Sequence, residues 1–77
     1  MLVSMKEMLS DAKAKKYAIP AFDVSNYEMM KAVLDTCEEL KSPALLQGLP
    51  IDFNGRDMNL LVDMNKGASN HYNIPVC

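Results

Sequence analysis

The chain has 77 residues, of which 49% are hydrophobic and 23% are charged, a composition unlike that of disordered, collagen-like or membrane-spanning chains. Its formal net charge of −2 provides no basic surface for nucleic acid or anionic lipid, so neither partner is expected. A chain of this length buries only about 60% of its unfolded surface, and one marginally stable domain is the most that it can form.

The first predicted element is a helix that begins after Ser4 and ends near Lys16. Ser4 and Glu7 fit the capping box, in which the serine hydroxyl and the glutamate carboxylate each bind a free backbone N–H. Apolar residues then recur at helical spacing and predict one packing stripe: Met5, Met8, Leu9 and Ala12. The lysines at 13, 15 and 16 oppose the partial negative charge at the helix end.

A strand is predicted over Tyr17–Val24, because nearly every position is apolar, as in a strand buried on both faces. Pro20 has no N–H to donate, so we expect it at the strand start, at a bulge or facing no neighbour. A second capping box, Ser25 to Glu28, then predicts a helix that ends before Pro43. Its predicted apolar stripe consists of Met30, Val33, Cys37 and Leu40.

The rest of the chain repeats the alternation of strand and helix. A short buried strand is predicted over Ala44–Gln47, a loop over Gly48–Gly55, and a helix between Asp57 and Tyr72. The apolar face of that helix is predicted to consist of Leu61, Met64, Ala68 and Tyr72. The residues 73–77 are typical of the opening of a third buried strand.

This order predicts an α/β fold with a leading helix followed by a right-handed βαβαβ unit of parallel strands. Three parallel strands leave two unpaired edges, which a complete domain avoids, so residues 1–77 are expected to be part of one larger domain. The alternative is a self-standing α/β module that associates with itself to cover its edges and acts as a non-catalytic binding or scaffolding unit.

Two polar residues are expected at the carboxyl ends of the first two strands, the edge where parallel α/β proteins bind ligands. Asp23 ends the first strand; it is a candidate ligand-binding residue, a solvated loop carboxylate or a capping partner for the next helix. Gln47 ends the second strand, where its amide can bind a hydroxyl or pair with loop backbone.

The remaining reactive residues have simpler interpretations. His71 has no second ligand at metal-binding spacing and is expected on the surface, and Cys37 lies on an apolar stripe as a packing residue. Cys37 and Cys77 are too few for a disulfide framework, and the start lacks the pattern of a signal peptide. We expect free thiols, a cytoplasmic location and no metal bound by these residues.

Four segments in order resemble the start of class II ketose-bisphosphate aldolases, a match that spans the whole chain. They are Met1-Leu-Val-Ser-Met-Lys-Glu-Met-Leu9, Tyr17-Ala-Ile-Pro-Ala-Phe-Asp-Val-Ser-Asn26, Lys41-Ser-Pro-Ala-Leu-Leu-Gln47 and Tyr72-Asn-Ile-Pro-Val76. The resemblance implies that the chain forms the first three strands of a (β/α)₈ TIM barrel, which needs roughly 250 residues.

The resemblance also implies an activity for the full-length enzyme. It would use zinc to cleave a phosphorylated ketose, reversibly, to dihydroxyacetone phosphate and an aldehyde in glycolysis or related carbohydrate metabolism, and would form a homo-oligomer. In the family the segment like Ile74-Pro-Val76 runs on into a Leu-His-Leu-Asp-His type of motif, which supplies a zinc ligand and the general acid/base. The present residues stop before that motif, so no activity is expected from this chain alone.

Two departures from the family pattern concern the substrate site. Asp23 stands at a position that usually holds asparagine near the substrate, so its role in substrate binding is implied in altered form. Leu49 stands where many members carry serine or threonine, which removes a polar contact. The resemblance therefore leaves fructose bisphosphate, tagatose bisphosphate and other phosphorylated ketoses as substrates.

Overall fold

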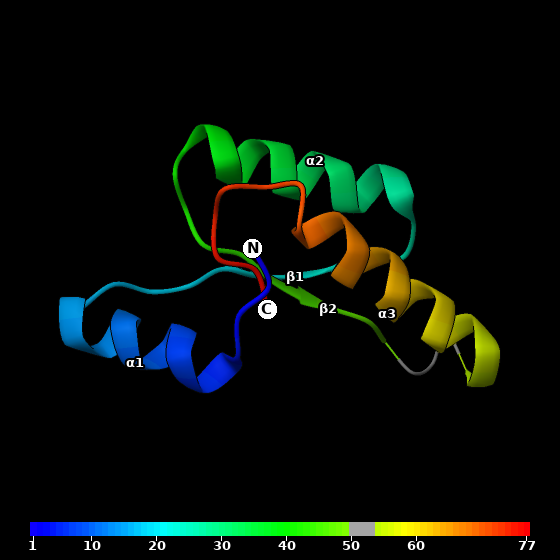
Figure 1. Cartoon of the computed structure of the whole chain (residues 1–77), viewed down its shortest axis with the longest axis horizontal. Coiled ribbons are helices and arrows are strands. Elements are labelled where there is room, and N and C mark those ends of the chain that lie inside the picture. The colour runs from blue at the N-terminus through cyan, green and yellow to red at the C-terminus, as the bar shows by residue number, and fades with distance from the viewer. Residues whose placement is uncertain (50–53) are drawn as a thin grey trace.

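The computed structural model describes residues 1–49 and 54–77 (Figure 1). In chain order its elements are α1 (Met5–Lys15), β1 (Ala21–Asp23), α2 (Tyr27–Glu39), β2 (Leu45–Gln47) and α3 (Gly55–Ser69). Residues 50–53 of the predicted loop lie outside the described residues, and Gly55 belongs to α3 rather than to that loop. None of the described helices combines the length and apolar composition needed to cross a bilayer.

The predicted ends of α1 are confirmed. Ser4 Oγ accepts a hydrogen bond from the backbone N–H of Glu7 at 3.1 Å, and Lys16 closes the helix in the left-handed conformation with a φ of 58°. The predicted stripe is only half right, because Met8 and Ala12 are buried whereas Met5 and Leu9 are each 48% exposed. The cause is the position of α1, which lies apart from the other two helices in Figure 1.

β1 is shorter and more exposed than the predicted strand over Tyr17–Val24. Tyr17 stays with α1, since its backbone N–H donates to the Ala12 carbonyl and its hydroxyl donates to Asp11. Pro20 directly precedes β1, and its carbonyl accepts from Leu45 N–H at 3.1 Å, which agrees with a proline at the strand start. All three residues of β1 are exposed, so burial on both faces was wrong. In the described residues β1 is an edge strand with β2 on one side only.

α2 begins one residue later than the capping box implies. The cap is Asn26, not Ser25, because Asn26 Oδ1 accepts from the N–H of Met29 at 2.9 Å. The buried residues of the helix are Met30, Leu34 and Cys37. Leu40, which was predicted to pack, is 72% exposed because it lies past the last helical turn, where the chain turns toward β2.

β2 confirms the place of the predicted second strand and pairs in parallel with β1, in the register Ala21 to Leu45 and Asp23 to Gln47. Its predicted burial was wrong, because Leu45 and Leu46 are half-buried and Gln47 is exposed. The predicted third strand, residues 73–77, is reduced to Val76, which forms isolated parallel bridges with Ala44 and with Leu2. Pro75 has no N–H to extend this ladder, and the N–H of Asn73 donates to Glu38 Oε1 instead. The third segment therefore pairs at one position only.

The strand segments follow one another across the sheet in the order β1, β2, Val76 and Leu2. Figure 1 shows α2 and α3 side by side over the same face of these strands, with both chain ends at the centre. The core lies between the strands and the two helices and consists of Met30, Leu34, Cys37, Ala44, Ile74 and Val76. The arrangement is a partial parallel α/β fold, as the predicted βαβ order requires.

Tyr72 was predicted on the apolar face of the third helix, but α3 ends at Ser69 and Tyr72 lies in the turn that follows. Its ring packs against the core, while its hydroxyl donates to Asp35 Oδ1 at 2.6 Å. Asp35 also pairs with Lys31 one helical turn earlier. The hydrogen bond between Tyr72 and Asp35 holds the segment before Val76 against the exposed surface of α2.

We predict that Tyr72→Phe destabilises the fold in a pH-dependent manner. Hydrogen bonds from Lys31 and Tyr72 lower the pKa of Asp35 below its ordinary 3.8, and the bond to Asp35, followed by burial, raises the pKa of Tyr72 to about 12. The Asp35 contribution is thus present above pH 3.8 and lost as the pH falls through the lowered pKa. The Tyr72 contribution is present below pH 10.0 and lost as the pH rises toward 12.

Thermal unfolding followed by circular dichroism should therefore show the largest difference in melting temperature between the chain and Tyr72→Phe near neutral pH. The difference should narrow toward both extremes. Tyr27→Phe is the matched control, because the Tyr27 hydroxyl makes no hydrogen bond within the described residues. An equal effect of the two substitutions at every pH would contradict the assignment.

We also predict that Lys16→Gly stabilises the chain by about 0.5–1 kcal/mol, because glycine adopts the left-handed conformation without the steric cost that lysine bears. Lys13→Gly removes the same side chain from inside α1 and should cost about 1 kcal/mol. Urea unfolding of both variants measures the free energy of unfolding, and a loss of stability in Lys16→Gly would refute the prediction.

Candidate functional site

The candidate site lies at the carboxyl ends of β1 and β2. Asp23 and Gln47 are the last residues of the two strands and are direct partners in the parallel register. The Gln47 carbonyl accepts from the N–H of Val24 at 2.9 Å, so this pairing continues to the point where the chain leaves β1. The structure thus brings together the two residues that the sequence placed at equivalent strand ends.

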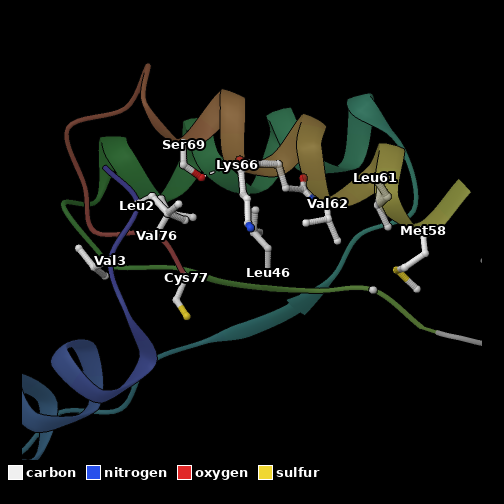
Figure 2. Close-up of a pocket in the computed structure, with 12 residues that line it drawn as sticks. Leu2, Val3, Leu46, Met58, Leu61, Val62, Lys66, Ser69, Val76 and Cys77 are labelled. Carbon is white, nitrogen blue, oxygen red and sulfur yellow. Dashed lines mark hydrogen bonds between the residues drawn. The ribbon is translucent and has the colours of Figure 1, made fainter. Parts of the chain in front are cut away.

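Their side chains share the face of the sheet opposite to α2 and α3. Leu46 packs against the core under those helices and, in Figure 2, lies beside α3. Because successive side chains in a strand point to opposite faces, Asp23 and Gln47 project away from the helices. Both residues are exposed. One carboxylate and one amide therefore stand next to each other on an open face.

This pair is suited to binding a polyhydroxylated molecule. An ionised carboxylate accepts hydrogen bonds from hydroxyl groups, and an amide both donates and accepts them. Two such side chains are too few to hold a metal ion, and the residues 1–49 and 54–77 contain no group of three His, Cys, Asp or Glu side chains in position to do so. A negatively charged carboxylate also disfavours a phosphate group in direct contact with Asp23.

A hollow near this edge of the sheet was not predicted from the sequence. It has a volume of about 260 Å³ and lies between the start of α2 at Ser25 and Asn26 and the first turns of α3. Helix amino ends attract anions, but Asp57 lines the hollow and Asn26 Oδ1 is already bonded to Met29. Asp57, the acidic residue in the first turn of α3, indicates where that helix begins, but no sequence signal indicated the hollow itself.

The other candidate residues have structural roles or none. Cys37 is buried in the core, and its burial raises the pKa of the thiol, which agrees with packing rather than reactivity. His71 is exposed after the end of α3, as expected for a surface histidine. Leu49 is 43% exposed and adds no polar group near Gln47. Cys37 and Cys77 are both free thiols.

Comparison with known proteins gives the family. The family model for class-II fructose-bisphosphate aldolase matches residues 3–77, a span that contains every helix and strand described above. No solved structure matched the chain. The matched span is consistent with an amino-terminal portion of the family, in agreement with the resemblance of the four sequence segments. The chain belongs to the class II fructose-bisphosphate aldolase family.

Proposed function

We propose that this chain is the amino-terminal part of a zinc-dependent aldolase that cleaves a phosphorylated ketose, reversibly, to dihydroxyacetone phosphate and an aldehyde. The observation that carries the proposal is the family match over residues 3–77. The parallel order of β1, β2 and Val76, joined by helices on one face, supports a place at the start of a (β/α)₈ barrel. Residues 1–77 are then one part of a single barrel domain.

In this proposal Asp23 and Gln47 bind the substrate. They stand at the carboxyl edge of parallel strands, which is where TIM-barrel enzymes place their active sites, and they project from the face that a closed barrel turns inward. Asp23 accepts hydrogen bonds from the ketose hydroxyls rather than from the phosphates, because two negative charges repel. Gln47 is the register partner of Asp23, so its amide can bind hydroxyl groups of the same ketose molecule.

Zinc is included in the proposal because the resemblance to the family implies it, and not because the described residues bind it. When bound, zinc polarises the ketose carbonyl as a Lewis acid. The residues 1–49 and 54–77 do not form a metal-binding group. In the proposed enzyme the zinc ligands and the proton-transferring carboxylate are therefore assigned to other residues of the complete barrel. This chain alone would therefore lack the chemistry, and the complete enzyme is proposed to be oligomeric.

The first prediction from this proposal is that the purified 77-residue chain, dialysed against zinc, does not cleave fructose 1,6-bisphosphate or tagatose 1,6-bisphosphate. A coupled assay of dihydroxyacetone phosphate release measures the rate, with an intact class II aldolase as the positive control. Turnover above background that is changed by Asp23→Asn, a substitution that a contaminating enzyme would not carry, would overturn the proposed inactivity.

The second prediction concerns Asp23 and Gln47 in a complete barrel. Residues 1–77 are joined to the remaining two thirds of a characterised class II aldolase in place of the equivalent segment. Asp23→Ala should lower kcat/KM by about tenfold or more, because hydrogen bonds to a charged group are worth about 1.5–3 kcal/mol. Gln47→Ala should lower it by about two- to tenfold, because hydrogen bonds between neutral groups are worth about 0.5–1.5 kcal/mol. Glu39→Ala, an exposed carboxylate at the end of α2, is the control that should leave the rate unchanged.

A further inference from the structure

Three backbone carbonyl groups near the end of the chain converge on the amino group of Met1. Its nitrogen donates to the carbonyl oxygens of Ser69 at 2.6 Å, Tyr72 at 2.9 Å and Ile74 at 2.7 Å. The two ends of the chain accordingly lie together at the centre of Figure 1. An ammonium group has three N–H donors, so each donor meets one carbonyl oxygen. The three carbonyls together have the form of a binding site for a primary ammonium group.

The positive charge of the amino group suits the electrostatics of these carbonyls. Ser69 is the last residue of α3, and the carbonyl groups at the end of a helix lack helical partners and carry partial negative charge. Ser69 and Ile74 are buried, which limits the access of water as a replacement partner. Hydrogen bonds from a charged donor are roughly twice as strong as those from a neutral one. The site therefore favours a charged amine over a neutral amide.

The amino group also fixes the position of the segment that pairs with Val76. The Met1 carbonyl accepts from the N–H of Val76, and the N–H of Val3 donates to the Val76 carbonyl, each at 2.8 Å. Leu2 lies beside Val76 in Figure 2 and is the outermost of the strand segments. Two strand segments that pair at one position only are not stable in water by themselves. The contacts of the ammonium group supply a further constraint at the end of this segment.

Side-chain packing explains less of this arrangement than the backbone contacts do. Met1 and Leu2 are 54% and 45% exposed, and Val3 is half-buried. Hydrophobic stabilisation is proportional to the apolar area that is removed from water, so exposed side chains contribute little. The hydrogen bonds of the Met1 amino group are therefore the main constraint that places Leu2 on the edge of the sheet.

We propose that the carbonyls of Ser69, Tyr72 and Ile74 form a binding site for a primary ammonium group, and that its occupation by Met1 holds the amino-terminal segment on the sheet. An acylated amine has no charge and one N–H, so it can bind only one of these carbonyls. The segment then leaves Val76, whose N–H and carbonyl become unpaired groups at a strand edge. The chemical state of the amino group thus decides whether this edge is covered. The inference does not depend on substrate, zinc or the aldolase assignment.

Hydrogen exchange tests the proposal on a 77-residue chain assembled by peptide ligation at Cys37, because synthesis allows the amino group alone to be varied. N-Acetylation should raise the exchange rates of the Val3 and Val76 N–H groups by about tenfold or more, since the hydrogen bonds of a charged donor are lost. The N–H of Leu45, which donates to the Pro20 carbonyl at 3.1 Å, is the internal control. Its exchange rate should not change.

Two further chains separate the effect of the amine from that of its surroundings. One glycine added before Met1 introduces an acyl group with the same two carbon atoms as acetyl, but it keeps a charged amine one residue away. This chain should exchange as fast at Val76 as the acetylated chain, because the site requires the amine on residue 1. Met1→Ala keeps the free amine and changes only an exposed side chain, so it should leave the exchange of Val76 unchanged.

Slow exchange at Val76 in the acetylated or the glycine-extended chain would overturn the proposal, as would fast exchange in the unmodified chain. Thermal unfolding followed by circular dichroism is a second readout, which applies even if acetylation unfolds the whole chain. The acetylated and glycine-extended chains should melt at lower temperatures than the unmodified and Met1→Ala chains. Equal melting temperatures of all four would contradict the proposal. These measurements are independent of the aldolase assays, which measure turnover.

Discussion

The fold depends on Val76, which lies between Leu2 and Ala44 and forms a parallel bridge with each of them. Its N–H donates to the Met1 carbonyl and its carbonyl accepts from Val3, while the adjacent Pro75 and Cys77 bond to Ala44 on the other side. The side chain is 1% exposed and belongs to the core with Leu34 and Ala44. A single residue thus joins the amino end of the chain, the second strand and the helical layer. Its loss would open the sheet at its centre.

The same arrangement explains why the core is concentrated on one face. α2 and α3 cover the side of the sheet to which Leu46 and Val76 contribute, and the described residues place nothing on the opposite side of β1. Ala21 and Asp23, whose side chains project to that open side, are consequently exposed, although the segment around them has the apolar pattern of a strand with two covered faces. An apolar strand without cover agrees with the proposal that residues 1–77 are part of a larger barrel, whose interior would enclose that face.

Local sequence signals predicted the helices better than the strands. Helix caps act within four residues, so Ser4 and the end of α1 at Lys16 could be located from the sequence alone. The length of a strand depends on its neighbouring strands, which a local sequence pattern does not reveal. The strand segment at Val76 ends at Pro75 because proline has no N–H to donate to the next strand. The pairing of Asp23 with Gln47 followed from the parallel order, but the contact of Tyr72 with Asp35 spans 37 residues and had no local signal.

The bridge from Leu2 to Val76 has a consequence for the order of assembly. It closes almost the entire chain into a loop, and such distant contacts form only after the entropy of the intervening residues has been lost. On a ribosome, which adds ~5–20 residues per second, α1 and the first helical crossover can form seconds before Val76 emerges from the exit tunnel. Leu2 therefore stays unpaired during synthesis until Val76 has left the ribosome and can form the bridge with it.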